Sequence, residues 1–396
     1  MTTLKTTTLD ADAVIAEAVA RSGLRDFGPD DFIEPLRRFT WACHDDAHIS
    51  AEGAAAIAET LIGKLISRLR FEDDLKRHPE ILDEPLVSPL FLIGAGRVGS
   101  TKMHRLLANA AGIQSLPFWQ LQNPAPSRDG TDQRQAACES FCTQIEHGLP
   151  QLFAAIEPVA DEPDEEVHLF DLTMRQFYFS ALAYTPSYFD WVHAQDWQSP
   201  YEYLKKLLQY LQWQNGTAGR PVLLKGPFHT PYIDIIARVF PDAKFVQIHR
   251  DPVTCAASLG KVAWMLQGIA HGTATKHEYG RLLEDYLVRS LVGNLAPREQ
   301  LASDQITDFY YEDVVADAPA LAEKIFQFWG QPLTDADRAA IRDWEATNRQ
   351  HKYGRFEYSL EEMGVNRVRM ETELAPYLQR FYPPTPPAPC SEETMK

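Results

Sequence analysis

A short stretch, residues 94–101, combines three glycines with an arginine and two hydroxyl residues between an apolar run and a helix-forming segment. Without a Cβ, glycine lets backbone N–H groups close around an anion, and the start of a helix adds unpaired N–H donors with a partial positive charge. The residues expected to contribute to such an anion-binding loop are Arg97, Val98, Gly99, Ser100 and Thr101.

Two common phosphate ligands fit this loop poorly. A nucleotide-hydrolysing P-loop places a lysine just before the final hydroxyl, and here that position is Ser100. The glycines also match a dinucleotide fingerprint, but residues 113–127 contain no Asp or Glu to hold a ribose. The sequence therefore predicts an anion that is neither a triphosphate nor NAD.

A second arginine follows another predicted strand. Arg250 comes directly after the predicted strand 244–249, and Ser258 follows eight residues later in a predicted helix that begins after Pro252. The carboxyl end of a parallel strand faces the crevice where ligands bind, and an arginine fork with a hydroxyl suits a phosphate monoester. A turn capped by Arg250 and Asp251 is the alternative interpretation.

Together these stretches resemble the sulfotransferase superfamily, in particular its bacterial-type branch. Residues 97–101 resemble the loop that binds the 5′-phosphosulfate of 3′-phosphoadenosine 5′-phosphosulfate (PAPS) in that family, and residues 224–258 resemble its 3′-phosphate motif. The resemblance assigns Arg250 and Ser258 to the 3′-phosphate. The resemblance extends to residues 351–359, which are similar to a closing loop of the family, where Lys352 and Arg355 would approach the 3′-phosphate. A solvated basic turn is the alternative interpretation.

The resemblance also implies catalytic residues at the strand 222–225. Lys225 matches the family lysine that stabilises the leaving oxygen, and His229 is our predicted general base, because a neutral imidazole accepts a proton near pH 7. The histidine follows the lysine by four residues, whereas two is the spacing in the hormone and phenol sulfotransferases, so a helix-capping role is equally compatible. Gln120 stands where many relatives carry a glutamate, and an amide cannot accept the proton.

The acidic run at residues 161–166 resembles the family segment over the acceptor site, but a solvated charged loop is the ordinary interpretation. Aromatic residues crowd the stretch after it, and we expect most of them to be helix core, with an apolar acceptor pocket as the alternative. They are Phe177, Tyr178, Phe179, Tyr184, Tyr188, Phe189, Trp191 and Trp197. The acceptor is a small molecule, and phenols, alcohols, lipids and sugars all remain open.

Strands at 90–93, 222–225, 244–249 and 306–310 alternate with helices, which predicts an α/β fold with a P-loop-like parallel sheet flanked by helices. We expect an N-terminal helical layer over residues 1–85 and an α/β domain over 86–382. That domain carries a helical insertion, predicted as a lid, at about 117–215, and a disordered tail follows at 383–396.

Composition limits the function classes. A formal net charge of −17 argues against binding nucleic acid, and no run approaches the ~20 apolar residues of a membrane span. Five scattered cysteines and no signal-like N-terminus indicate a reduced, cytoplasmic protein, and no metal is implied. The predicted function is sulfonate transfer from PAPS to an acceptor hydroxyl. A non-catalytic nucleotide- or partner-binding relative and a small-molecule kinase are the alternatives.

Overall fold

A parallel four-stranded sheet forms the centre of the protein in the computed structural model, which describes residues 9–128, 130–348, 352 and 354–383. The strand order is β2-β1-β3-β4. The bounds are β1 Val87–Gly94, β2 Pro221–Lys225, β3 Lys244–His249 and β4 Ile306–Tyr310. The predicted α/β class and parallel sheet are confirmed, because the short apolar runs at these places pair as buried neighbours.

The register of the sheet brings the carboxyl ends of three strands to one edge. Leu92 pairs with Lys225 on β2 and with Val246 on β3, and Gly94 pairs with Ile248. The residues that follow β1 and β3 therefore emerge beside each other, and Lys225 ends β2 at the same edge.

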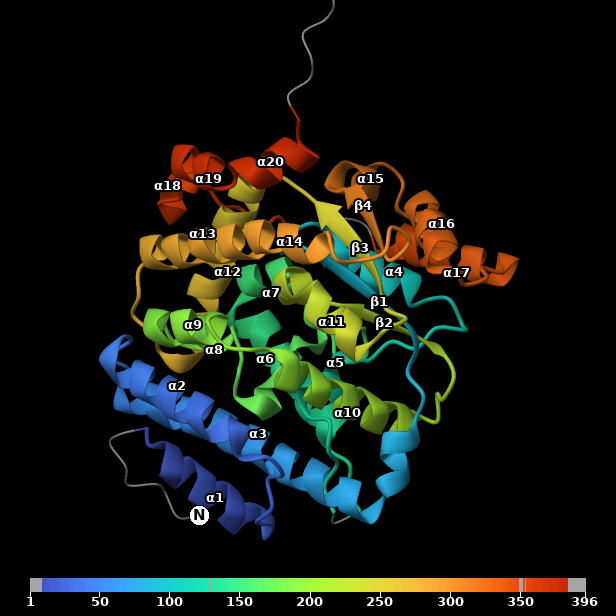
Figure 1. The fold of residues 1–396 in the computed structure, drawn as a ribbon. Coiled ribbons are helices and arrows are strands. Elements are labelled where there is room, and N and C mark those ends of the chain that lie inside the picture. Colours follow the sequence, from blue (N-terminus) through green and yellow to red (C-terminus); the bar gives the residue numbers. More distant parts are fainter. Residues whose placement is uncertain (1–8, 129, 349–351, 353, 384–396) are drawn as a thin grey trace, which may run out of the picture.

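Helices cover both faces of this sheet (Figure 1). On one face α4 packs against β1 and β2, and α16 and α17 pack against α4. On the other face the 3-10 helix η4 packs on β1, with α11 and α13 against η4. The bounds are α4 Ser100–Leu107, η4 Pro227–Tyr232, α11 Ile233–Val239, α12 Pro252–Leu266, η5 Gln267–Ala270, α13 Lys276–Gly293, α14 Leu295–Arg298, α15 Tyr311–Ala316, α16 Ala318–Trp329 and α17 Asp335–Thr347.

A helical insertion separates α4 from β2, as expected from the sequence. Its elements are α5 Phe118–Gln122, α6 Arg134–Gly148, α7 Pro150–Ile156, η3 Glu166–Thr173, α8 Phe179–Leu182, α9 Pro186–His193 and α10 Gln198–Asn215. The C-terminal elements α18 Leu360–Met363, α19 Arg367–Glu373 and α20 Ala375–Phe381 lie beside α12 and α13. The predicted tail from residue 384 onward lies outside the described residues.

The N-terminal helices form a layer at the bottom of Figure 1. They are α1 Ala11–Ser22, α2 Ile33–Asp45 and α3 Ala51–Arg77, followed by the 3-10 helix η2 Pro79–Asp83; another, η1 Asp30–Phe32, precedes α2. Their buried residues belong to the same hydrophobic core as the sheet. The domain boundary at residue 85 stays a prediction. Buried residues on both sides of residue 85 pack into one hydrophobic core.

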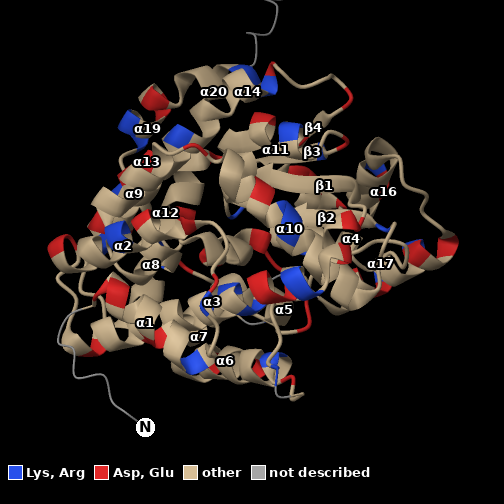
Figure 2. Ribbon diagram, turned by 60° about the horizontal axis from the view of Figure 1, so that its bottom comes forward, with Lys and Arg blue, Asp and Glu red and all other residues tan. Residues whose placement is uncertain are grey.

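Charges are dispersed over the described part of the chain. Figure 2 shows Lys and Arg positions scattered over the helices with Asp and Glu positions among them. Within the described residues no helix is long and apolar enough to cross a membrane.

One buried arginine joins the N-terminal layer to the insertion. Arg68 is 0% exposed, and its guanidinium donates to the carbonyl oxygens of Phe27, Pro29 and Leu172, each at 2.7 Å. It also lies 3.3 Å from an Asp31 carboxylate oxygen. A buried guanidinium is tolerated because nearly all its donors are satisfied, and its removal leaves buried acceptors without partners.

The substitution Arg68→Met should therefore destabilise the fold by about 3 kcal/mol, because three carbonyls lose their donor at once. Thermal unfolding followed by circular dichroism should show a melting temperature several degrees below that of the wild type. The matched control is Arg77→Met on the same helix, where the side chain is 55% exposed and its ion pairs, with Asp73 at 3.9 Å and Asp74 at 3.5 Å, are long. An unchanged melting temperature for Arg68→Met would contradict this role.

Candidate functional site

A cavity of about 680 Å³ opens at the carboxyl edge of the sheet. One part of its lining is polar and comes from the glycine turn, β2, β3 and α12. Those residues are Gly96, Arg97, Gly99, Ser100, Thr101, Lys102, Lys225, Arg250 and Ser258. The rest is largely apolar and comes from the helical insertion, α12 and α13.

The turn after β1 needs its glycines. Gly94 has φ +133°, and a Cβ there would lie 2.3 Å from the carbonyl oxygen of Ile248. Gly99 has φ +84° and is the N-cap of α4, yet no side chain caps that helix. The first-turn N–H groups of α4 therefore face the polar end of the cavity without a side-chain acceptor, as the predicted anion loop requires.

Arg97 crosses the polar end of the cavity. Its backbone adopts φ +70°, a conformation that non-glycine residues rarely take. Its Nε donates to Ser258 Oγ at 3.2 Å and its Nη1 to the carbonyl oxygen of Ala155 at 2.7 Å. Burial lowers the pKa of Arg97. Val98, by contrast, is packed into the hydrophobic core and its side chain does not line the cavity.

Arg250 reaches the glycine turn from β3. Its Nη1 donates to the carbonyl oxygen of Arg97 at 2.6 Å, and its guanidinium stacks 4.0 Å from the centre of the Tyr311 ring. Ser258 lies on α12 in the cavity wall and accepts a hydrogen bond from Arg97. The two stretches that the sequence nominated as separate anion sites thus meet in one cavity.

The two basic residues nominated near the C-terminus differ in position. Lys352 lines the cavity and donates from Nζ to Asn348 Oδ1 at 3.4 Å. Arg355 is exposed and does not line the cavity, so the structure does not bring it to the site. His351 and Tyr353 lie outside the described residues.

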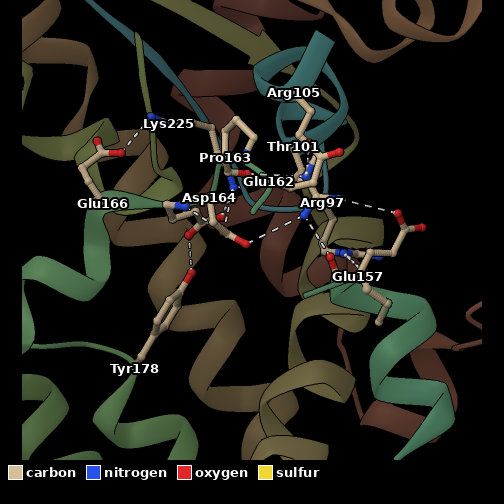
Figure 3. A network of polar contacts seen from close by, with 12 residues as sticks. Arg97, Thr101, Arg105, Glu157, Glu162, Pro163, Asp164, Glu166, Tyr178 and Lys225 are labelled. Atoms are coloured by element: carbon tan, nitrogen blue, oxygen red, sulfur yellow. Dashed lines mark hydrogen bonds and ion pairs between the residues drawn. The ribbon is translucent and has the colours of Figure 1, made fainter. Parts of the chain in front are cut away.

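Lys225 is buried at the end of β2, with 1% of its side chain exposed. Its Nζ donates to Thr101 Oγ1 at 3.2 Å and to Glu165 Oε1 at 2.7 Å, with Asp164 Oδ1 at 3.8 Å. Figure 3 shows Lys225 and Thr101 converging on the acidic segment, with Tyr178 pointing toward it from below. The Tyr178 hydroxyl donates to the second oxygen of Glu165.

The acidic segment is therefore not the solvated loop that its composition favoured. Glu166 is 1% exposed and accepts the backbone N–H of Lys225 at 2.9 Å. Burial would raise the pKa of Asp164, but the charges of Lys225 and Arg105 outweigh burial and lower the pKa. Arg105 holds the segment from α4, donating to the carbonyl oxygens of Glu157 at 2.9 Å and Pro163 at 3.5 Å (Figure 3).

His229 lies behind the cavity wall. It is 0% exposed and does not line the cavity. One ring nitrogen lies 2.8 Å from the Tyr201 hydroxyl, and the other is bound to Glu166. With both nitrogens engaged, His229 cannot reach an acceptor in this geometry, so its assignment as the contacting base needs correction. It supports Glu166, which in turn holds the backbone of Lys225.

Gln120 also lies away from the cavity. Its side-chain amide forms two hydrogen bonds with the amide of Asn215, at 2.7 and 3.0 Å, and it is 4% exposed. The replacement of glutamate at this position therefore removes no group from the cavity of this protein.

The apolar part of the cavity is rich in aromatic rings. Half of the eight aromatic residues that the sequence singled out line it, as expected for an apolar acceptor pocket, and the other half do not. Of those residues, Phe177, Tyr178, Phe179 and Phe189 line the cavity, whereas Tyr184, Tyr188, Trp191 and Trp197 do not. Further apolar lining comes from Phe118, Phe141, Val167, Phe228, Val262, Leu266, Ile269, Leu282 and Tyr286.

Several polar residues of the cavity were missed by the sequence interpretation. Lys64, Lys102, Arg105 and His168 all line it, and so does Glu165, which the sequence had placed in the acidic run but without a role. A signal existed for Lys64, because it lies on the buried face of α3 between Leu61 and Arg68, where a charged residue needs a partner.

No group of described residues is arranged to hold a metal ion. Cys43, Cys138, Cys142 and Cys255 are buried free thiols, and Cys390 lies outside the described residues. Arg, Lys and backbone N–H groups are thus the cationic and donor groups that face the polar end of the cavity.

The chain is similar to known proteins over most of its length. A family model described as "Sulfotransferase family" matches residues 89–335. Over 299 residues the chain is 21% identical to omega-hydroxy-beta-dihydromenaquinone-9 sulfotransferase Stf3 of Mycobacterium bovis, covering 70% of this chain and 71% of that protein.

Two solved structures are similar over nearly the whole chain. Sulfotransferase STF9 from Mycobacterium avium has a TM-score of 0.85 and 27% identity, covering 96% of this chain and 98% of that one. Sulfotransferase STF1 from Mycobacterium tuberculosis has a TM-score of 0.80 and 27% identity, covering 93% and 99%. The family match spans more than half of the sequence and contains the anion loop, Lys225 and Arg250, so this chain belongs to the sulfotransferase family.

Proposed function

We propose that this sulfotransferase uses PAPS as its donor and transfers the sulfonate to a hydroxyl of a small, largely apolar acceptor. The observation that carries the proposal is the contact between Arg250 and the carbonyl oxygen of Arg97, because it joins two anion-binding elements in one cavity. A donor with phosphate groups at both the 5′ and 3′ positions of its ribose needs both elements.

The residues at the polar end fit such a donor. The uncapped start of α4, with Ser100 and Thr101, offers N–H and hydroxyl donors for the 5′-phosphosulfate. A Cβ at position 96 would lie 2.8 Å from Leu259 Cδ2, so the glycine there keeps the turn close to α12. Arg250 and Ser258 supply a guanidinium and a hydroxyl for the 3′-phosphate, and Lys352 is a third cation in the same wall.

A kinase function finds little support in this site. A P-loop kinase has a lysine that contacts the β- and γ-phosphates, and Ser100 occupies that position here. Arg97 is the one basic residue within the loop 94–101. The Arg97 side chain is turned toward α12, where its Nε donates to Ser258 Oγ at 3.2 Å, so it does not take the place of a lysine at position 100.

Lys225 is placed to stabilise the leaving group. In sulfonyl transfer the bond between sulfur and the donor phosphate oxygen breaks, and negative charge develops on that oxygen. A buried ammonium hydrogen-bonded to Thr101 at the start of α4 supplies positive charge where this oxygen would lie. Because Lys225 is held by the sheet on one side and by Glu165 on the other, its position is fixed before the reaction.

Glu165 is our proposed general base in place of His229. Its carboxylate lines the cavity, lies 2.7 Å from Lys225 Nζ, and is oriented by the Tyr178 hydroxyl. The acceptor hydroxyl would pass its proton to this carboxylate as its oxygen forms the new bond to sulfur. The apolar lining beside Tyr178 suits an acceptor that is mostly hydrocarbon or aromatic.

Donor identity is tested by thermal shift. Adenosine 3′,5′-bisphosphate (PAP), the desulfonated donor, should raise the melting temperature more than ADP or ATP at equal concentration, because only PAP occupies both anion elements. Arg250→Met and Ser258→Ala should weaken PAP binding, the arginine variant by 10-fold or more, since charged hydrogen bonds contribute about 1.5–3 kcal/mol each.

The matched control is Arg220→Met, because Arg220 is exposed and does not line the cavity. An ATP-selective shift, or PAP binding that is unaffected in both site variants, would contradict the proposed donor.

The base is tested by Glu165→Gln. We expect kcat for sulfonate transfer from radiolabelled PAPS to fall about 100-fold, because the amide cannot accept the proton. PAP affinity should be retained, which separates a lost base from a lost donor site. The assay uses an acceptor found by screening phenols, alcohols, lipids and sugars.

Glu139→Gln on the exposed face of α6 is the control for this experiment and should keep wild-type kcat. His229→Gln tests the earlier assignment. The result that would contradict Glu165 as the base is a wild-type kcat in Glu165→Gln with a 100-fold lower kcat in a correctly folded His229→Gln. His229 would then be the general base.

A further inference from the structure

A second polar cluster interrupts the apolar lining of the cavity, apart from the residues assigned to the donor and to proton transfer. It consists of Lys64 from α3, Gln122 from α5, and His168 and Asp171 from η3. All four line the cavity, together with Thr60.

The cluster is built and partly buried. Lys64 Nζ lies 2.7 Å from Asp171 Oδ2 and donates to the backbone carbonyl of Gln122 at 2.8 Å and to its side-chain oxygen at 3.3 Å. The side chains of Lys64 and Asp171 are 11% and 8% exposed. The pair joins η3 to α3 and also lines the cavity. An ion pair at this depth is costly to desolvate, and an apolar wall would avoid that cost.

His168 is the open member of the cluster. Its ring lies between the rings of Phe118 and Tyr178, with centroid distances of 5.3 and 5.9 Å. No hydrogen bond from its ring is found among the described residues, although the ring faces the cavity. Burial lowers the pKa of His168 despite the opposing effect of Asp171, so the ring is neutral near pH 7 and carries one donor and one acceptor nitrogen.

We propose that His168, which lines the cavity together with the Lys64–Asp171 pair, binds a second oxygen of the acceptor. That oxygen would be a carbonyl or a hydroxyl remote from the one that is sulfonated. The proposal rests on the proposed function and narrows the acceptor class. The acceptor is then an apolar molecule with a flat or ring-containing part that packs beside the rings of Phe118 and Tyr178. It carries oxygen atoms at two separated positions.

The chemistry of the cluster favours a neutral oxygen over an anion. Lys64 is already neutralised by Asp171, so the net charge of the pair is zero. A neutral imidazole donates to a carbonyl or accepts from a hydroxyl equally well. A carboxylate or sulfate on the acceptor would meet Asp171, which lines the same wall.

The test measures acceptor binding rather than turnover, with PAP saturating the donor end. The probes are pairs that share an apolar skeleton and differ by one remote oxygen: 2-naphthol with 2,6-dihydroxynaphthalene, 4-phenylphenol with 4,4′-dihydroxybiphenyl, and androstan-3-ol with its 17-ketone. Dissociation constants come from isothermal titration or native mass spectrometry. For at least one pair, wild-type protein should bind the two-oxygen member about tenfold more tightly, the gain expected for one buried hydrogen bond.

His168→Phe should abolish that preference while keeping the ring contacts with its aromatic neighbours, and His168→Gln should retain part of it. His147→Phe on the exposed surface of α6 is the matched control and should keep the preference. Lys64→Met is a second variant, and its melting temperature is measured first because it leaves Asp171 without its partner.

Equal binding within every pair, or an unchanged preference in His168→Phe, overturns the proposal, as does the absence of binding by both members of all pairs. PAP binding and sulfonate transfer to a single-oxygen acceptor would stand in those cases, so a failure here is distinguishable from a failure of the proposed function.

Discussion

The buried ammonium of Lys225 is the constraint around which the site is arranged. The Lys225 side chain is 1% exposed, and a buried charge needs hydrogen-bonding partners. Its partners come from two parts of the chain that are distant in sequence. Thr101 begins α4 and belongs to the glycine turn, whereas Glu165 belongs to the helical insertion. One side chain at the end of β2 therefore locks the anion loop, the sheet and the insertion in one relative position.

That requirement extends outward to the N-terminal helices. The segment that carries Glu165 continues into η3, and η3 is held against α3 by Asp171, which pairs with Lys64, and by the carbonyl of Leu172, which accepts from Arg68. The N-terminal layer consequently supports the acidic segment from behind. A boundary drawn at residue 85 separates two sequence regions but not two independent cores.

Local patterns predicted most of the fold and most of the residues that line the polar end of the cavity. The strands are short apolar runs, and parallel strands bring their carboxyl ends to one edge, so the meeting of Arg250 with the glycine turn followed from topology. Side-chain direction and burial did not follow. His229 emerges beside Lys225 in sequence, yet the 3-10 turn of η4 points its ring behind the wall to Tyr201. Glu165 was interpreted as part of a solvated run because the lysine that buries it lies 60 residues away.

The charge distribution explains how such a site works in an acidic protein. A net charge of −17 repels anions at long range, but that field is screened beyond about 8 Å at physiological ionic strength. Binding of the multiply charged donor that we propose must then come from contacts within the cavity, which Arg97, Arg250 and the start of α4 line. Selectivity consequently depends on geometry more than on total charge. A ligand with one phosphate cluster satisfies one element and leaves the other arginine hydrated, whereas a ligand phosphorylated at two positions satisfies both.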